Sequence, residues 1–155
     1  ETIGVSIGPV TVPEILNRPQ IVIRNPRSGL QISQFNRWTE PLKTEIAAIL
    51  ADNIAALCGS DRIIPYTREN LFQPEYRLVI HIILLEGKPP EEIRLEAVWS
   101  IRENKTGKTM RLGKSRFQEP LISESCDDLM AAHSRILAAF SRELARELSA
   151  AIAGN

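Results

Sequence analysis

The sequence has little of what marks a metalloenzyme or a disulfide-stabilised domain. It contains two cysteines and two histidines, and none of them is spaced like the ligands of a zinc site. No Gly-x-Ser-x-Gly elbow is present, and no glycine-rich turn leads into a helix to hold a phosphate. His81 and His133 fall on a strand and on a helix stripe, where histidines are usually packed or hydrogen-bonded. The sequence therefore predicts no catalytic residue, no metal and no cofactor.

An excess of charge of one sign is also missing. The chain carries 19 basic and 19 acidic residues, so its formal net charge at pH 7 is zero. Because no overall positive field draws in phosphates, nucleic acid is not expected as a partner. Copies of a neutral chain repel one another weakly, which permits a homo-oligomer.

No apolar stretch is long enough to cross a membrane. The longest candidate, residues 78–85, is interrupted by His81 and has the length of a strand, whereas a span needs about 20 residues. The chain begins at Glu1 without a charged and apolar leader, so we expect any signal peptide to lie outside it. A length of 155 residues with 43% hydrophobic content predicts one domain, 1–155, with one core.

Alternation of apolar and polar residues predicts strands over much of the chain. Gly8 and Pro9 predict a bulge in the first strand, and the turn signals in 25–29 and 104–108 predict hairpins. The strand at 76–86 is apolar on both faces, as in a central strand that is covered on both sides. The strand at 109–117 is basic and suits an edge. The predicted strands are 3–12, 21–24, 30–33, 62–65, 76–86, 93–102 and 109–117.

Two stretches have the spacing of amphipathic helices. Pro41 suits the first turn of one helix and Gly59 its end, while Ser125 can cap the other. Their apolar stripes are Leu42, Ile46, Ile49, Leu50, Ile54 and Leu57, and then Leu129, His133, Ile136, Phe140, Leu144, Leu148 and Ile152. The order of elements predicts an α+β fold: a mixed, mainly antiparallel β-sheet with two long amphipathic α-helices packed on one face.

The two cysteines fall at ends of the two predicted helices. Cys58 ends the first helix and Cys126 begins the second. If the helices are antiparallel neighbours, the two residues could lie within the roughly 4.4–6.8 Å Cα separation of a disulfide, given an oxidising compartment. Two free thiols are the alternative. The stretch 56–59 looks superficially like a lipid-attachment box, but it ends a helix, so we do not expect acylation there.

Two segments of the first third resemble a known family, and weaker similarity continues through the first helix, 77–85 and 97–101. The resembling residues are Val10, Thr11, Val12, Pro13, Glu14, Leu16, Arg18, Pro19, Gln20 and Ile21, and then Phe35, Asn36, Arg37, Trp38, Thr39, Glu40 and Pro41. They resemble the ABC-type transport auxiliary lipoproteins, in particular the branch of PqiC, paraquat-inducible protein C.

The resemblance implies a lipid-anchored domain on the periplasmic side of the Gram-negative outer membrane. Members accompany MCE-domain proteins, which carry lipids between the two membranes, so the implied role is docking without catalysis, in support of membrane integrity. The acylated cysteine would lie upstream of Glu1 in a longer chain. Two alternatives stay open: a direct lipid carrier with an apolar cavity between helices and sheet, and an enzyme of unrecognised type.

The resembling segments also suggest where a partner could bind. Five polar or aromatic residues near strand ends are candidates: Arg18, Gln20, Arg24, Arg37 and Trp38. Arginine and tryptophan are enriched at the centres of protein interfaces. The alternative is structural, because Pro13 and Pro19 fix the backbone and Trp38 can hold the entry of the helix at Pro41.

Overall fold

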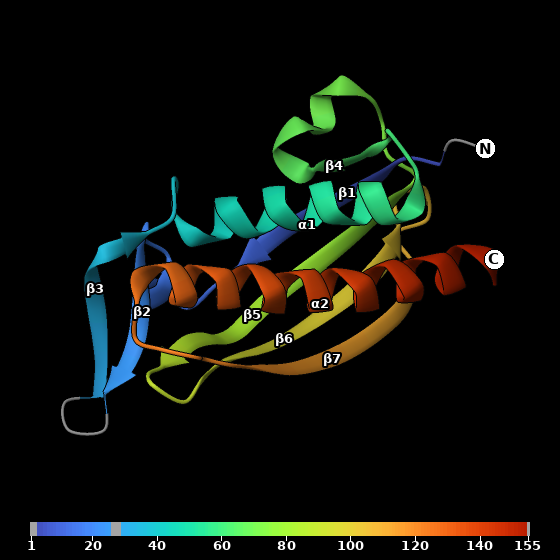
Figure 1. Ribbon diagram of the computed structural model, residues 1–155. Helices are drawn as coiled ribbons and strands as arrows, with labels where there is room; N and C mark the ends of the chain where they lie inside the picture. The colour runs from blue at the N-terminus through green and yellow to red at the C-terminus, as the bar shows by residue number, and fades with distance from the viewer. Residues whose placement is uncertain (1–2, 26–28, 155) are drawn as a thin grey trace.

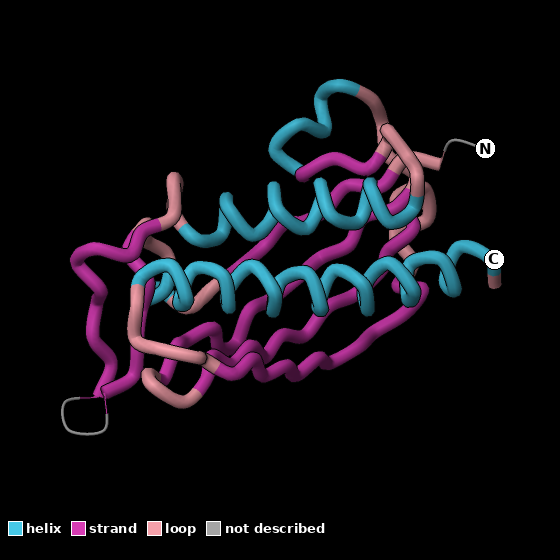
Figure 2. Tube along the Cα trace, in the orientation of Figure 1, coloured by secondary structure: helices cyan, strands magenta, loops and turns pink. Residues whose placement is uncertain are grey.

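Two helices cover one face of a seven-stranded sheet (Figure 1). The computed structural model describes residues 3–25 and 29–154. Figure 2 shows both long helices on the same side of the strands, and the described residues place no helix on the other side of the sheet. The predicted α+β class is confirmed, and so is the placement of both helices on one face.

The elements follow the predicted order. The helices are α1 (Leu42–Cys58) and α2 (Cys126–Ala153), and two 3₁₀ turns, η1 (Glu14–Leu16) and η2 (Tyr66–Leu71), lie between strands. The predicted hairpin turn at 25–29 lies largely outside the described residues. The strands are β1 (Val5–Thr11), β2 (Gln20–Asn25), β3 (Gly29–Arg37), β4 (Ile63–Pro65), β5 (Tyr76–Lys88), β6 (Glu92–Glu103) and β7 (Thr109–Pro120).

The sheet is built around β5, its longest strand. β5 pairs antiparallel with β6 and parallel with β1, and its far end meets β2 at the pair Gly87 and Ile23. The strands β3, β4 and β7 lie at edges, each with one neighbour. The register between β1 and β5 shifts between Ile7 and Val10, which confirms the bulge predicted at Gly8 and Pro9.

The two helices run side by side in the same direction. Leu42 and His133 line one small hollow near the helix starts, and farther along the Asn53 amide donates to Ser141 Oγ at 3.1 Å. At the end of α1, Cys58 lies beside Ala145 and Arg146. Most of both apolar stripes is buried against the sheet, but Leu57, predicted to end the α1 stripe, is exposed at the last turn of that helix. Ser125 caps α2 by accepting from the Asp128 amide.

The parallel direction removes the condition on which a disulfide between Cys58 and Cys126 depended. Cys58 lies at the end of α1, whereas Cys126 lies at the beginning of α2, and both thiols are exposed and free. Cys126 precedes Ala145 by 19 residues along α2, which is about 28 Å at the rise of an α-helix. No disulfide spans that separation.

The placement of β5 corrects a second expectation, that this strand is covered on both faces. Its helix-facing residues Leu78, Ile80 and Ile82 are fully buried, but His81 is exposed and Ile83 retains 40% of its surface. The prediction of two covering layers came from the apolar residues on both faces of the strand. A sequence pattern shows which side chains share a face, but it does not show whether another element packs on that face. The described helices supply only one layer.

Candidate partner-binding surfaces

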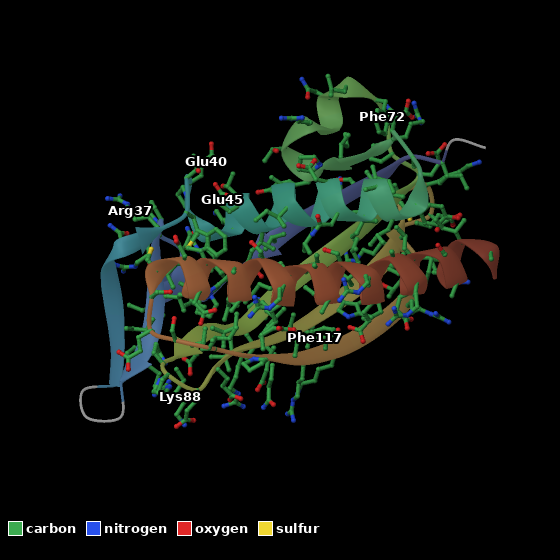
Figure 3. The ribbon with its side chains drawn as sticks, viewed as in Figure 1. Arg37, Glu40, Glu45, Phe72, Lys88 and Phe117 are labelled. Atoms are coloured by element: carbon green, nitrogen blue, oxygen red, sulfur yellow. The ribbon has the colours of Figure 1, made fainter. Side chains whose placement is uncertain are left out.

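Four of the five candidate residues are brought together at one end of the β2–β3 hairpin. Gln20 stands opposite Arg37 in the strand pair, and the Trp38 amide donates to the Pro19 carbonyl at 2.6 Å. Arg18 precedes Pro19, and its Nε donates to the Ile15 carbonyl at 2.9 Å. Arg37 is exposed and projects from the end of β3 next to the start of α1 (Figure 3). We call Arg18, Gln20, Arg37 and Trp38 the strand-end cluster.

Arg24 does not belong to the strand-end cluster. It lies at the other end of β2, where its Nε contacts Glu86 Oε2 at 2.7 Å. The Glu86 side chain is only 7% exposed, whereas the Arg24 side chain keeps 45% of its surface. The hydrogen bond and charge of Glu86 raise the pKa of Arg24 above its ordinary value. Arg24 thus serves first to neutralise a nearly buried carboxylate of the central strand.

Trp38 has a structural contact as well as a surface. Its ring packs edge to face with the His133 ring, at a centroid distance of 5.6 Å and an interplanar angle of 78°. His133 is buried and its Nδ1 lies 2.9 Å from the Leu129 carbonyl. Burial lowers the pKa of His133 to about 4. The hollow beside these two rings holds about 10 Å³, which is barely room for one water molecule.

The uncovered face of the sheet presents a second surface, which the sequence did not reveal. Val79 of β5, Val98 of β6 and Leu112 of β7 lie together there and line an open hollow of about 440 Å³. Leu112 is 75% exposed. His81 borders the hollow, and its Nδ1 lies 2.5 Å from Thr11 Oγ1. We call Val79, Val98 and Leu112 the open-face patch.

A signal for the open-face patch was present in the sequence. Val79 and Ile83 alternate with the buried residues of β5, and Leu112 is an isolated large apolar residue in a basic strand. Val79 and Ile83 were expected on a face covered by a second layer. Only the spatial arrangement shows that nothing in the described chain covers them.

A third hollow of about 480 Å³ lies on the outer side of the two helices. It is lined by Leu57 and Cys58 at the end of α1 and by Arg142, Ala145, Arg146 and Ser149 of α2. Leu57 is 52% exposed, so the helix end keeps apolar surface in contact with water.

The side chains on these surfaces suit contact with another protein. Within residues 3–25 and 29–154, no three His, Cys, Asp or Glu residues lie close enough together to hold a metal ion. Apolar patches, arginines and the half-buried Trp38 offer burial and ion pairs, as protein interfaces do. No helix among the described residues combines the length and apolar character needed to span a bilayer.

Comparison with known proteins places the chain in a family. The family model of the ABC-type transport auxiliary lipoprotein component matches residues 1–145. The chain therefore belongs to the ABC-type transport auxiliary lipoproteins, and the resemblance found in the sequence is confirmed. No match is found among curated protein sequences.

Solved structures share the fold at low sequence identity. A protein from Xanthomonas campestris has a TM-score of 0.79 at 13% identity, with 94% of this chain and 82% of that chain covered. A hypothetical protein from Chlamydia trachomatis has a TM-score of 0.56 at 12% identity, with 98% and 99% covered. The PelC dodecamer from Paraburkholderia phytofirmans has a TM-score of 0.53 at 11% identity, with 88% and 84% covered. At these identities the likeness shows the fold alone.

Proposed function

We propose that this chain is the non-catalytic periplasmic domain of an outer-membrane lipoprotein that docks with an MCE-type intermembrane lipid transport system and so supports membrane integrity. A lipid anchor upstream of residue 1 would hold the domain at the membrane. Membership of a transport auxiliary family, over residues 1–145, is the observation that carries the proposal.

The surface of the domain supports a docking role. Arg37 is exposed next to the half-buried Trp38. Both lie at the end of the β2–β3 hairpin that is opposite its turn, just before α1. A partner that covered this end would gain apolar contact from the indole and ion pairs from the guanidinium. We therefore propose the strand-end cluster as the contact with the MCE-domain protein. Arg24 contributes less, because it is engaged with Glu86.

Self-association is part of the proposal. The chain is neutral overall, and PelC, which shares the fold, is a dodecamer. A ring or a smaller homo-oligomer would repeat the strand-end cluster in a symmetric array, and several weak contacts would then act together on one transporter.

A direct binding measurement tests docking. The domain would be immobilised and the periplasmic region of the MCE-domain protein encoded with it flowed across. We expect binding that weakens at least about tenfold for Arg37→Ala, because an interface arginine contributes more than about 1.4 kcal/mol. Lys43→Ala, an exposed change on α1, is the matched control. Failure of the wild-type domain to bind would contradict the proposal, and equal binding by Arg37→Ala would remove the strand-end cluster from it.

A direct lipid carrier is the rival function, and lipid content separates it from docking. A carrier needs an apolar cavity of several hundred Å³, whereas the hollow between helices and sheet beside Trp38 holds about 10 Å³. Solvent extraction of the purified protein should yield no stoichiometric phospholipid. One phospholipid per chain would favour the carrier.

A further inference from the structure

The open-face patch is surrounded by positive charge. Arg77 of β5 and Arg102 of β6 stand opposite each other on the same face. They form the next pair on this face after Val79 and Ser100. Lys114 of β7 stands opposite Val98. Arg102 and Lys114 are exposed. Three cationic side chains thus border a small apolar surface.

One acidic residue, Glu96, also borders the patch, and it is paired with two arginines. It lies one step beyond Val98 on β6. Its carboxylate lies 3.5 Å from Arg94 and 3.9 Å from Arg116. The charge of Glu96 is therefore balanced by its neighbours, and the border of the patch stays cationic.

The dimensions of the open face suit a helix. Neighbouring strands lie about 4.8 Å apart, so the three strands β5, β6 and β7 span about 10 Å, which equals the diameter of an α-helix with its side chains. On the other face, α2 packs over β6 and β7, and α1 lies beside it over β1 and β4 (Figure 2). A helix on the open face would complete a three-layer arrangement, which is how a sheet with apolar residues on both faces is usually buried.

We propose that the open face of β5, β6 and β7 docks an amphipathic helix of a partner protein, whose apolar stripe covers Val79, Val98 and Leu112 and whose flanking Asp or Glu residues pair with Arg102 and Lys114. The inference rests on the proposed docking function and names a second contact with the transport system, apart from the strand-end cluster.

Two other occupants fit the open face less well. The hollow is shallow and open to solvent, so a single lipid would leave one side of its acyl chain in water, whereas small-molecule sites bury about 70–90% of a ligand. A second copy related by a two-fold axis through the patch would bring Arg102 and Lys114 of both copies into one contact. Like charges that meet in an interface weaken it.

Site-specific photo-crosslinking identifies the occupant. Leu112→p-benzoylphenylalanine would be made in the full-length lipoprotein in its native cell envelope, and the cross-linked peptides sequenced by mass spectrometry. Leu112 is 75% exposed, so the change is compatible with folding. Ala131→p-benzoylphenylalanine, at an exposed position on α2, is the control.

We expect the Leu112 position to cross-link a peptide of another protein, with apolar residues at helical spacing and carboxylates beside them, at least about tenfold above the Ala131 position. The double variant Arg102→Glu with Lys114→Glu should reduce that yield at least about tenfold, whereas Arg102→Lys with Lys114→Arg should keep it.

Several results would overturn the inference: a cross-link to this chain itself, a phospholipid adduct, no product above the control, or an equal yield after charge reversal. If such a result came with an intact complex, the second contact would be lost while the docking proposal stood. Loss of binding between the domain and the MCE-domain protein would instead remove the docking proposal itself.

Discussion

Trp38 and His133 meet edge to face, with ring centroids 5.6 Å apart, and join the entry of α1 to the first turns of α2. The contact explains how a residue predicted as a partner contact can also hold the fold. Trp38 is half-buried, so part of its ring remains available at the surface. Its two roles can be separated by measuring stability and binding on the same variants.

Replacing Trp38 should destabilise the protein, whereas replacing its neighbour should not. Trp38→Ala removes the ring from His133 and from the core beneath it, and we expect a loss of about 2 kcal/mol, below the range for a fully buried tryptophan. Arg37→Ala changes an exposed side chain and should alter stability by less than about 0.5 kcal/mol. Urea unfolding of both variants tests this. Equal stability of the two would contradict the structural role of Trp38.

Stability should fall in mild acid because of His133. Burial lowers its pKa in the folded protein to about 4, against about 6.5 in an unfolded chain. Between these values the unfolded chain binds a proton at this residue and the folded chain does not, so a falling pH favours unfolding. The neutral ring therefore contributes roughly 3 kcal/mol to the free energy of unfolding. This contribution is complete above about pH 6.5 and is lost as the pH falls toward 4.

Chemical unfolding between pH 4 and pH 7 measures this effect. His133→Leu should remove the corresponding part of the pH dependence, whereas His81→Ala, which changes the exposed histidine, should retain it. The same slope in wild type and His133→Leu would show that other groups cause the acid sensitivity.

Gly113 provides room for a buried indole. A Cβ atom at this position would lie 2.1 Å from Cζ2 of Trp99, whose Nε1 donates to Ser115 Oγ at 3.0 Å. We expect Gly113→Ala to cost about 1–3 kcal/mol in unfolding free energy. In a Trp99→Phe background the same substitution should cost less, because the smaller ring leaves space. Equal costs in the two backgrounds would mean that the indole does not limit this position.

The cysteines should behave as two independent thiols. Cys58 and Cys126 are exposed and lie far apart along parallel helices. Alkylation of the unreduced, denatured protein should therefore modify both, as mass spectrometry would show. A species with no modified cysteine and a mass lower by two hydrogen atoms would demonstrate an internal disulfide and contradict the helix arrangement.

Features set by a few neighbouring residues could be predicted from the sequence. Ser125 marks the start of α2 because its side chain accepts from the Asp128 amide, and Gly59 ends α1 because it adopts the left-handed conformation, with φ of 61°. The register shift between β1 and β5 is also local, because Gly8 and Pro9 lie at the position where the pairing is interrupted.

Features set by long-range topology could not be predicted. The direction of α2 relative to α1 depends on how the chain crosses three intervening long strands, and no local pattern encodes it. The sequence therefore left open whether Cys58 and Cys126 form a disulfide or two free thiols, and the structure shows them free. The outer face of β5 was assigned to the interior for a related reason: Val79 and Ile83 have apolar side chains, but only coverage by another element would bury them.

The candidate binding residues show the same difference between local and long-range features. Arg18, Gln20, Arg37 and Trp38 could be grouped because a hairpin returns one segment to the other. Arg24 was grouped with them by sequence proximity, whereas its partner Glu86 is 62 residues away in the chain. The open-face patch draws on three strands and has no continuous sequence signature.

The most direct test of the docking account is affinity purification of the full-length lipoprotein from native membranes, followed by native mass spectrometry of the intact assembly. We expect the lipoprotein to be recovered with an MCE-domain protein, without a stoichiometric phospholipid bound to the lipoprotein domain. Recovery of the lipoprotein without that companion, with one phospholipid held by each chain, would contradict the account.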